Sequence, residues 1–153
     1  MKIKVKITAL FTLLVTAILL LLSLSIFYFS KLERRENFKA RLTGRANINT
    51  QLYSIVGDTN LAALGRFDSA SVTIPQKSVT IFNRHNIPIY QFNAGGSDTI
   101  RASPEILNEA RIQQRFFFNE DEKEAVAYHF VDGQRDVVIV VGGFDEDGWQ
   151  RLR

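Results

Sequence analysis

The chain has 153 residues, with 19 lysines and arginines, 16 aspartates and glutamates, and a formal net charge of +3. It contains no cysteine, which excludes disulfides, zinc–thiolate sites and thiol catalysis. The positive charge gathers near the N-terminus, since residues 46–153 carry 10 basic residues against 14 acidic ones. A nucleic-acid-binding protein would carry a basic face on its folded domain, so we expect no nucleic-acid partner. The distribution suits anionic lipid headgroups beside a membrane.

An uncharged apolar segment occupies residues 7–29, after a short tail of residues 1–6 that holds three lysines. About 20 such residues in a helix cross a hydrocarbon layer roughly 30 Å thick. A cleaved signal peptide has a shorter apolar core, of about 7–15 residues, which ends at a small-residue cleavage site. Here bulky apolar residues follow Ser23-Leu24-Ser25 instead. The segment therefore predicts one uncleaved transmembrane helix, whose serines and threonines hydrogen-bond to their own backbone.

Residues 30–65 predict a juxtamembrane helix. Proline is absent from this range, and apolar residues follow a spacing of three to four at Phe38, Leu42, Ile48, Leu52 and Ile55. Such a stripe packs against the protein's own domain or pairs with a second copy, so we expect both, and hence a homodimer. Gly57 marks a break.

The next residues predict a connector at 66–77 and then a hairpin. Residues 78–83 and 87–93 alternate apolar and polar side chains, which is typical of half-buried strands. The turn between them includes Asn86, a residue that tolerates positive φ. Pro88 has no N–H for a ladder, so its strand begins there or lies at an edge. A loop follows at 94–98.

The last part of the chain predicts a helix and a second hairpin. Ser103 is a good N-cap for a helix over 104–114. A polar turn at 119–124 leads to strands at 125–131 and 137–141, and the second of these is apolar on both faces, so we place it centrally. Acidic residues at 145–147 resemble the first turn of another helix over 145–153. The chain thus reads as the front portion of a longer protein.

These elements predict an α+β fold: a transmembrane helix that continues into a long helix, then a small antiparallel sheet with one covering helix. Their order resembles the extracytoplasmic sensor region of bacterial membrane-bound sensor histidine kinases. The stretches SVTIFNRHNIPIYQFN and RDVVIVVGGFDEDGWQRL look like the opening hairpin and the closing strand-to-helix junction of their PAS-like sensor domains.

The resemblance implies an inner-membrane protein with a cytoplasmic N-terminus and a periplasmic sensor domain at residues 66–144. Counting lysines and arginines does not establish this orientation, because more of them follow the apolar segment than precede it. The resemblance also implies a two-component system, in which the domain receives an unknown stimulus or small ligand. No phosphoacceptor or nucleotide-binding motif occurs in the chain, so we expect no enzyme activity from this segment and no cofactor.

Three arginines, Arg101, Arg111 and Arg115, are candidates for holding a small anionic ligand, although arginines around a surface helix need none. His85 is expected in a turn and His129 in a strand, without the clustering that metal ligands need. Asp121, Glu122 and Glu124 lack the spacing of a calcium loop, and three consecutive phenylalanines at 116–118 suit packing, so no metal site is predicted.

A pilin-like structural subunit is the alternative. The stretch from Phe11 looks like a pilin's mature N-terminus, but Leu10 stands where the leader peptidase needs glycine and Val15 where assembly needs glutamate. A membrane-anchored adaptor is a further alternative, which the sequence does not separate from a sensor.

Overall fold

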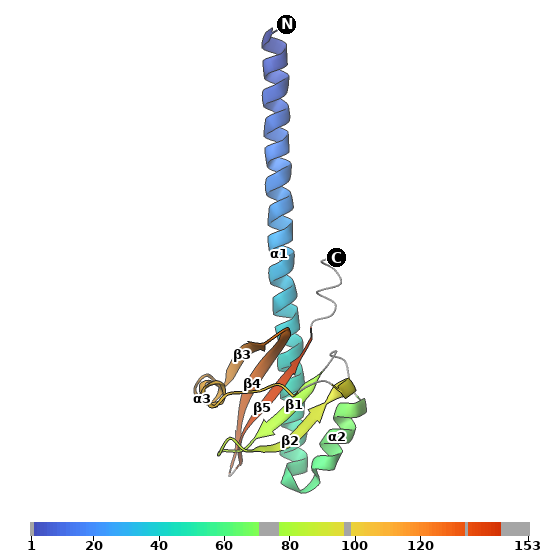
Figure 1. Cartoon of the computed structure of the whole chain (residues 1–153), viewed down its shortest axis with the longest axis vertical. Coiled ribbons are helices and arrows are strands. Elements are labelled where there is room, and N and C mark those ends of the chain that lie inside the picture. The colour runs from blue at the N-terminus through green and yellow to red at the C-terminus, as the bar shows by residue number, and fades with distance from the viewer. Residues whose placement is uncertain (1, 71–76, 97–98, 134, 145–153) are drawn as a thin grey trace. The chain divides into compact units, whose positions relative to one another are not determined.

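A computed structural model describes residues 2–70, 77–96, 99–133 and 135–144 (Figure 1). The chain divides into two compact units, Met1–Asn37 and Phe38–Arg153. Helix α1 (Lys2–Val56) supplies the first unit and the beginning of the second. The helix predicted over 145–153 lies outside the described residues.

The first unit holds the apolar segment. Among the described residues, α1 is the one helix long and apolar enough to cross a membrane, which is compatible with a membrane anchor. The hydroxyls of Thr8, Thr16 and Ser25 donate to backbone carbonyls four residues earlier, at 2.8–2.9 Å. The prediction that these polar groups are satisfied within the helix is therefore confirmed.

The second unit contains a five-stranded antiparallel sheet, which confirms the predicted α+β class. Its strands are β1 (Ser78–Phe82), β2 (Pro88–Asn93), β3 (Arg115–Glu120), β4 (Lys123–Asp132) and β5 (Arg135–Gly143). Their order across the sheet is β2-β1-β5-β4-β3. The apolar strand β5 is central, as predicted, and the strand that begins at Pro88 lies at an edge.

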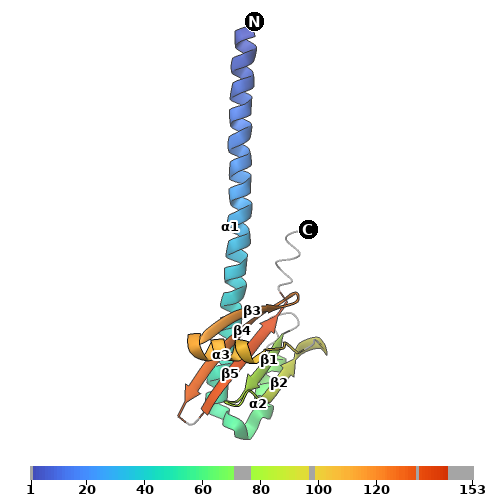
Figure 2. The same ribbon diagram turned by 60° about the vertical axis from the view of Figure 1, so that its left-hand side comes forward.

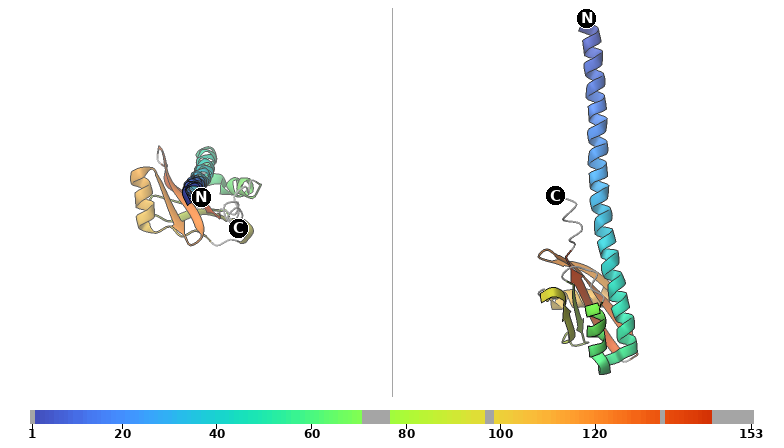
Figure 3. Two further views of the ribbon diagram at one scale, coloured as in Figure 1. Left: turned by 90° about the horizontal axis from the view of Figure 1, so that it is seen from above. Right: turned by 90° about the vertical axis from the view of Figure 1, so that its right-hand side faces the viewer.

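Two apolar clusters lie on opposite faces of this sheet, because successive residues of a strand point to opposite sides. Val137, Ile139 and Val141 pack with the buried residues of α1. Val138 and Val140 pack with helix α3 (Pro104–Gln113) through Leu107 and Ala110. Figures 2 and 3 show α3 lying against one face of the strands, with the part of α1 that belongs to this unit, from Phe38 onwards, against the other.

The buried stripe of α1 differs from the predicted one. Ile48 and Ile55 are 42% and 81% exposed, so the predicted stripe does not lie on one packed face, although its Leu52 does pack against the core. The face that packs on the sheet includes Phe38, Leu42, Ala46 and Tyr53, together with the polar Arg45, Asn49 and Thr50. Polar side chains occupy core positions of this helix, so hydrophobic periodicity alone selects the wrong side after Leu42.

The predicted connector at 66–77 is wrong in its first part. The 3₁₀ turn η1 (Gly57–Asn60) follows α1, and α2 (Leu61–Ala70) includes residues 66–70. Gly57 has a φ of +65°, which confirms the break predicted there. The stretch from Arg66 to Ala70 holds neither proline nor glycine, and its Asp68 is buried among polar partners. Residues 71–76 lie outside the described ranges.

Strand β3 is an element that sequence reasoning missed. Phe116 and Phe118 pack against the α3 cluster, whereas Phe117 points to the other face, where Lys39 lies 5.1 Å from the centre of its ring. The polar turn predicted over 119–124 is therefore limited to Asp121 and Glu122, since β3 continues to Glu120 and β4 begins at Lys123.

Local turn and cap chemistry is as predicted. The Ser103 hydroxyl accepts a hydrogen bond from the Ile106 N–H at 3.4 Å and caps α3, although the helix ends one residue before Gln114. Asn86 has a φ of +61° in the first hairpin turn. The loop predicted over 94–98 begins as a short 3₁₀ turn, η2 (Ala94–Gly96).

Gly142→Ala should lower the free energy of unfolding by about 1–3 kcal/mol. A Cβ at this position in β5 would overlap Ile100 Cδ1 and come within 2.9 Å of Ala125 Cβ and 3.0 Å of the Glu124 carbonyl oxygen. Urea unfolding of the detergent-solubilised protein measures the loss. Gly44→Ala is the control, because nothing lies within 4 Å of its Cβ and a helix gains from alanine. Equal effects of the two variants would contradict the packing described here.

Candidate functional site

A buried ion pair lies between α2 and the start of the sheet. Lys77 Nζ lies 2.6 Å from Asp68 Oδ1, and both side chains are fully buried. Lys77 directly precedes β1, and its carbonyl accepts a hydrogen bond from the Ala94 N–H at 2.8 Å. A charge taken out of water is costly unless it is paired and hydrogen-bonded. The pair therefore fixes where α2 sits on the sheet.

Further polar groups from α1 and β2 complete the cluster. Tyr90 Oη donates to Asp68 Oδ2 at 2.6 Å, and Asn49 Nδ2 donates to Asp68 Oδ1 at 3.3 Å. The Lys77 ammonium also lies 5.4 Å from the centre of the Phe92 ring. The Asp68 carboxylate thus accepts hydrogen bonds from side chains of α1, of β2 and of Lys77, the residue before β1. We call Asn49, Asp68, Lys77 and Tyr90 the Asp68 cluster.

Burial shifts two pKa values in this cluster. Desolvation lowers the pKa of Lys77, although the hydrogen bond and charge of Asp68 oppose the shift. Desolvation raises the pKa of Tyr90, and the hydrogen bond to Asp68 and its negative charge add to the effect. The tyrosine consequently stays a neutral donor to the Asp68 carboxylate well into alkaline solution.

Tyr90→Phe should lower the free energy of unfolding by about 1–3 kcal/mol near neutral pH, because Asp68 loses a buried donor. The pKa of Tyr90 is raised in the folded state, so the unfolded chain loses the phenol proton first, above its usual pKa of 10.0. This contribution to stability is full below that pH and is lost as the pH rises further. The difference in the free energy of unfolding between wild type and Tyr90→Phe should therefore become smaller above about pH 10. Calorimetric unfolding across the alkaline range tests this, and a constant gap would contradict it.

A second polar connection joins β5 to the last turn of α1. Arg135 Nη1 donates to the carbonyls of Tyr53 and Ser54 at 3.4 and 3.1 Å, and the guanidinium carbon lies 5.8 Å from the centre of the Tyr53 ring. A cation is favourable at the negative end of a helix. Gly57 permits this approach, because a Cβ there would lie 2.8 Å from Arg135 Nη2.

The three predicted arginines occupy different surroundings. Arg111 donates from Nη1 to Asn86 Oδ1 at 2.6 Å and from Nη2 to the Asn83 carbonyl at 2.9 Å, so it ties α3 to the first hairpin turn. Arg101 is exposed, and its backbone N–H donates to Glu120 Oε2 at 2.6 Å. Arg115 is exposed on the edge strand β3, opposite Tyr128. Within the described residues, their contacts do not bring these three arginines together around one cavity.

The histidines lie where the sequence places them. His85 is exposed in the first hairpin turn, and its N–H donates to Asn83 Oδ1 at 2.9 Å. His129 in β4 lies 2.8 Å from Asp136 Oδ1, through Nε2. In the described part of the chain, which includes Asp121, Glu122 and Glu124, no three His, Asp or Glu side chains are placed to hold a metal ion.

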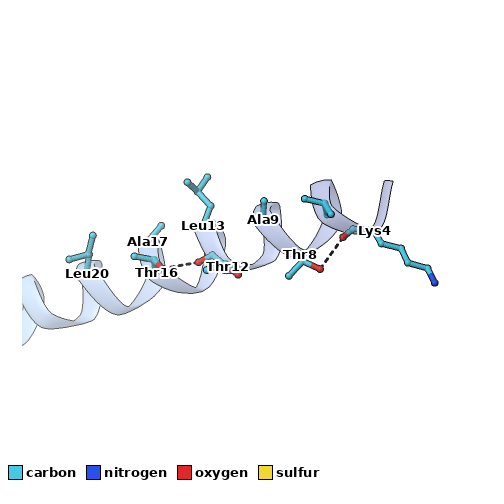
Figure 4. A pocket seen from close by; sticks show the side chains of 9 residues that line it. Lys4, Thr8, Ala9, Thr12, Leu13, Thr16, Ala17 and Leu20 are labelled. Carbon is cyan, nitrogen blue, oxygen red and sulfur yellow. Dashed lines mark hydrogen bonds between the residues drawn. The ribbon is translucent and has the colours of Figure 1, made fainter. Parts of the chain in front are cut away.

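A groove of about 810 Å³ runs along one face of the apolar segment, between Lys4 and Leu20 (Figure 4). Apart from Lys4 at one end, its walls are apolar or threonine side chains of one helix. The Thr8 and Thr16 hydroxyls already donate to their own backbone, as the dashed lines show. The groove therefore offers few polar groups to a ligand.

Sequence reasoning missed the Asp68 cluster and Arg135. Asp68 and Lys77 fell inside the predicted connector, where charged residues are ordinarily solvated. One signal was available: Arg45 and Asn49 lie four residues apart, in line with Leu42 and Tyr53 on the same helix face. Polar residues on a packed helix face indicate buried partners elsewhere in the chain.

Comparison with models of known protein families, with curated proteins and with solved structures finds no match to this chain.

Proposed function

We propose that the chain is the signal-sensing region of a membrane-bound two-component sensor histidine kinase. Its apolar segment anchors it in the inner membrane, beside lipid headgroups that the basic residues contact, and its sheet lies in the periplasm. A stimulus changes the packing of the sheet, and α1 carries that change towards the membrane. The kinase activity belongs to parts of such a protein that this chain does not contain.

The observation that carries the proposal is the pair of polar connections between α1 and the sheet. The Asp68 cluster reaches α1 through Asn49, and Arg135 reaches its last turn through two carbonyls. A helix held only by apolar contacts adjusts with little energetic penalty, whereas buried polar groups have few satisfied arrangements. Such contacts are typical of an element that changes between two discrete packings. Because α1 also contains the apolar segment, we infer that it carries such a change towards the membrane.

A chimeric kinase tests the sensing role. Residues 1–144 replace the first span and extracytoplasmic domain of a two-span sensor kinase, and a transcriptional reporter reads its output. Arg135→Gln should shift the basal output, because it removes the charge at the end of α1. Arg115→Gln makes the same chemical change on the exposed edge strand and should leave the output unchanged. If deletion of residues 77–144 also leaves the output unchanged, the sensing role is wrong.

Orientation is testable because the chain has no native cysteine. Ile112 is 78% exposed, so Ile112→Cys should react with a membrane-impermeant maleimide added to the periplasmic side of intact cells. Lys4→Cys should react only after the inner membrane is permeabilised. The reverse pattern would place the sheet in the cytoplasm, and recovery of the protein in the soluble fraction would exclude the anchor.

We propose that the sensor is a homodimer. Ile48 and Ile55 remain exposed on α1, seven residues apart, which is the spacing of one helix face that meets a second copy. Oxidative cross-linking of Ile55→Cys in membranes should give a dimer, and Ile112→Cys is the matched exposed control. Equal cross-linking of both would indicate random collision.

A further inference from the structure

A cavity of about 340 Å³ lies beside Arg135. Its lining comes from α1, α2, the first hairpin turn and strands β2 and β5. Leu61, Ile89 and Val137 supply an apolar side. The volume is at the lower end of the range of about 300–1,000 Å³ that small-molecule sites occupy, so a compact molecule fits it better than an extended one.

The charged groups on the polar side of the cavity are two arginines and one carboxylate. Arg84, His85 and Arg135 line it, with Asp136 as the acidic member. The Asp136 carboxylate already interacts with groups outside the lining: it lies 2.8 Å from His129 Nε2 and 3.9 Å from the cationic Arg111 at Nε. The lining thus holds two guanidinium groups and one carboxylate, a balance that favours an anion.

Arg135 has donors to spare for such a ligand. Among the described residues, both hydrogen bonds of its guanidinium come from Nη1, and the one to Tyr53, at 3.4 Å, is long for an N–H···O bond. A carboxylate forms shorter, charge-assisted and often bidentate bonds with a guanidinium. A carboxylate that binds the guanidinium through Nη1 and Nη2 would thus compete with the Tyr53 and Ser54 carbonyls for Nη1.

We propose that this cavity binds a small organic anion. Arg84 and Arg135 hold its acid group, and Leu61, Ile89 and Val137 surround its apolar part. Binding draws Arg135 away from the last turn of α1 and loosens the end of that helix. The link from binding to output rests on the sensing role proposed above, whereas the binding itself does not.

Titration of the full chain in lipid nanodiscs tests the binding, with benzoate, hexanoate and benzenesulfonate as probes. At least one should bind saturably at millimolar concentration and raise the melting temperature. Benzamide, which has the same ring without the charge, should do neither. Saturation-transfer NMR measures contact, and amide hydrogen exchange at residues 57–60 should become faster when the anion binds. Absence of saturable binding by all three anions, or equal binding of benzamide, would overturn the proposal.

Variants assign the site to the two arginines. Arg84→Gln and Arg135→Gln should each weaken binding of the best probe by about tenfold or more. Arg84 is exposed at the turn, so its variant keeps the test valid if Arg135→Gln unfolds. Arg101→Gln is the matched control outside the cavity, and an equal loss there would show that binding is non-specific.

The two proposals fail in different ways. If the probe binds but leaves the chimeric kinase unchanged, the binding site stands and its role in signalling is wrong. If no probe binds while the output still depends on Arg135, the ligand proposal is wrong and the sensing role stands.

Discussion

Asp68→Asn should lower the free energy of unfolding by about 3–5 kcal/mol near neutral pH, the largest effect of a conservative change that we expect in this chain. Asparagine has nearly the same shape, so the variant leaves the packing intact. It removes the only counter-charge that lies within 4 Å of the fully buried Lys77 ammonium among the described residues. Urea unfolding of the detergent-solubilised protein, followed by near-ultraviolet circular dichroism, measures the loss.

The pH dependence and a double variant separate charge from packing. The pKa of Lys77 is already lowered by burial, and without Asp68 it should fall further. The unfolded chain then binds more protons than the folded one below the usual lysine pKa of 10.5, so the stability of Asp68→Asn should rise as the pH rises towards that value. Asp68→Asn/Lys77→Met should recover most of the loss, since it removes both charges. A double variant as unstable as the single one would contradict the ion-pair account.

Leu42→Ala should lower the free energy of unfolding by about 2–5 kcal/mol. Leu42 is fully buried in the cluster that α1 forms with β1, β4 and β5, so truncation leaves a cavity among packed side chains. Urea unfolding of the detergent-solubilised protein measures this loss as well. The result also tests whether the part of α1 from Phe38 onwards belongs to the folded unit of the sheet.

Ile55→Ala is the control for this prediction. Ile55 lies on the same helix and is 81% exposed in a single copy, so its truncation should change the stability of the monomer by less than about 0.5 kcal/mol when unfolding is measured at a concentration too low for dimerisation. The two residues were indistinguishable in the predicted apolar stripe. Similar losses at both positions would mean that the helix packs differently from the arrangement described here.

Elements with strong local chemistry were predictable from the sequence. The hairpin of β1 and β2 follows from alternation, from a turn with an αL asparagine and from Pro88. The cap of α3 follows from Ser103 and the proline after it. The central place of β5 follows from its unbroken apolar run, which requires cover on both faces.

The remaining features depend on contacts between distant residues. Strand β3 carries three consecutive phenylalanines, so it shows no alternation in residue type even though its side chains alternate between faces. The packed face of α1 after Leu42 mixes Ala46 and Tyr53 with polar residues, and the buried Asn49 finds its partner in Asp68, nineteen residues later. The role of Arg135 depends on carbonyls more than eighty residues earlier. No local pattern encodes such pairs.

The strand order has a consequence for biosynthesis. Strand β5 is the last to leave the ribosome, yet it lies between β1 and β4 and joins the two halves of the sheet. Until it emerges, Phe38 and Leu42 have only part of their apolar partners, although they are made about a hundred residues earlier. The nascent chain therefore leaves part of this apolar helix face uncovered until β5 has been synthesised, which is a state prone to aggregation.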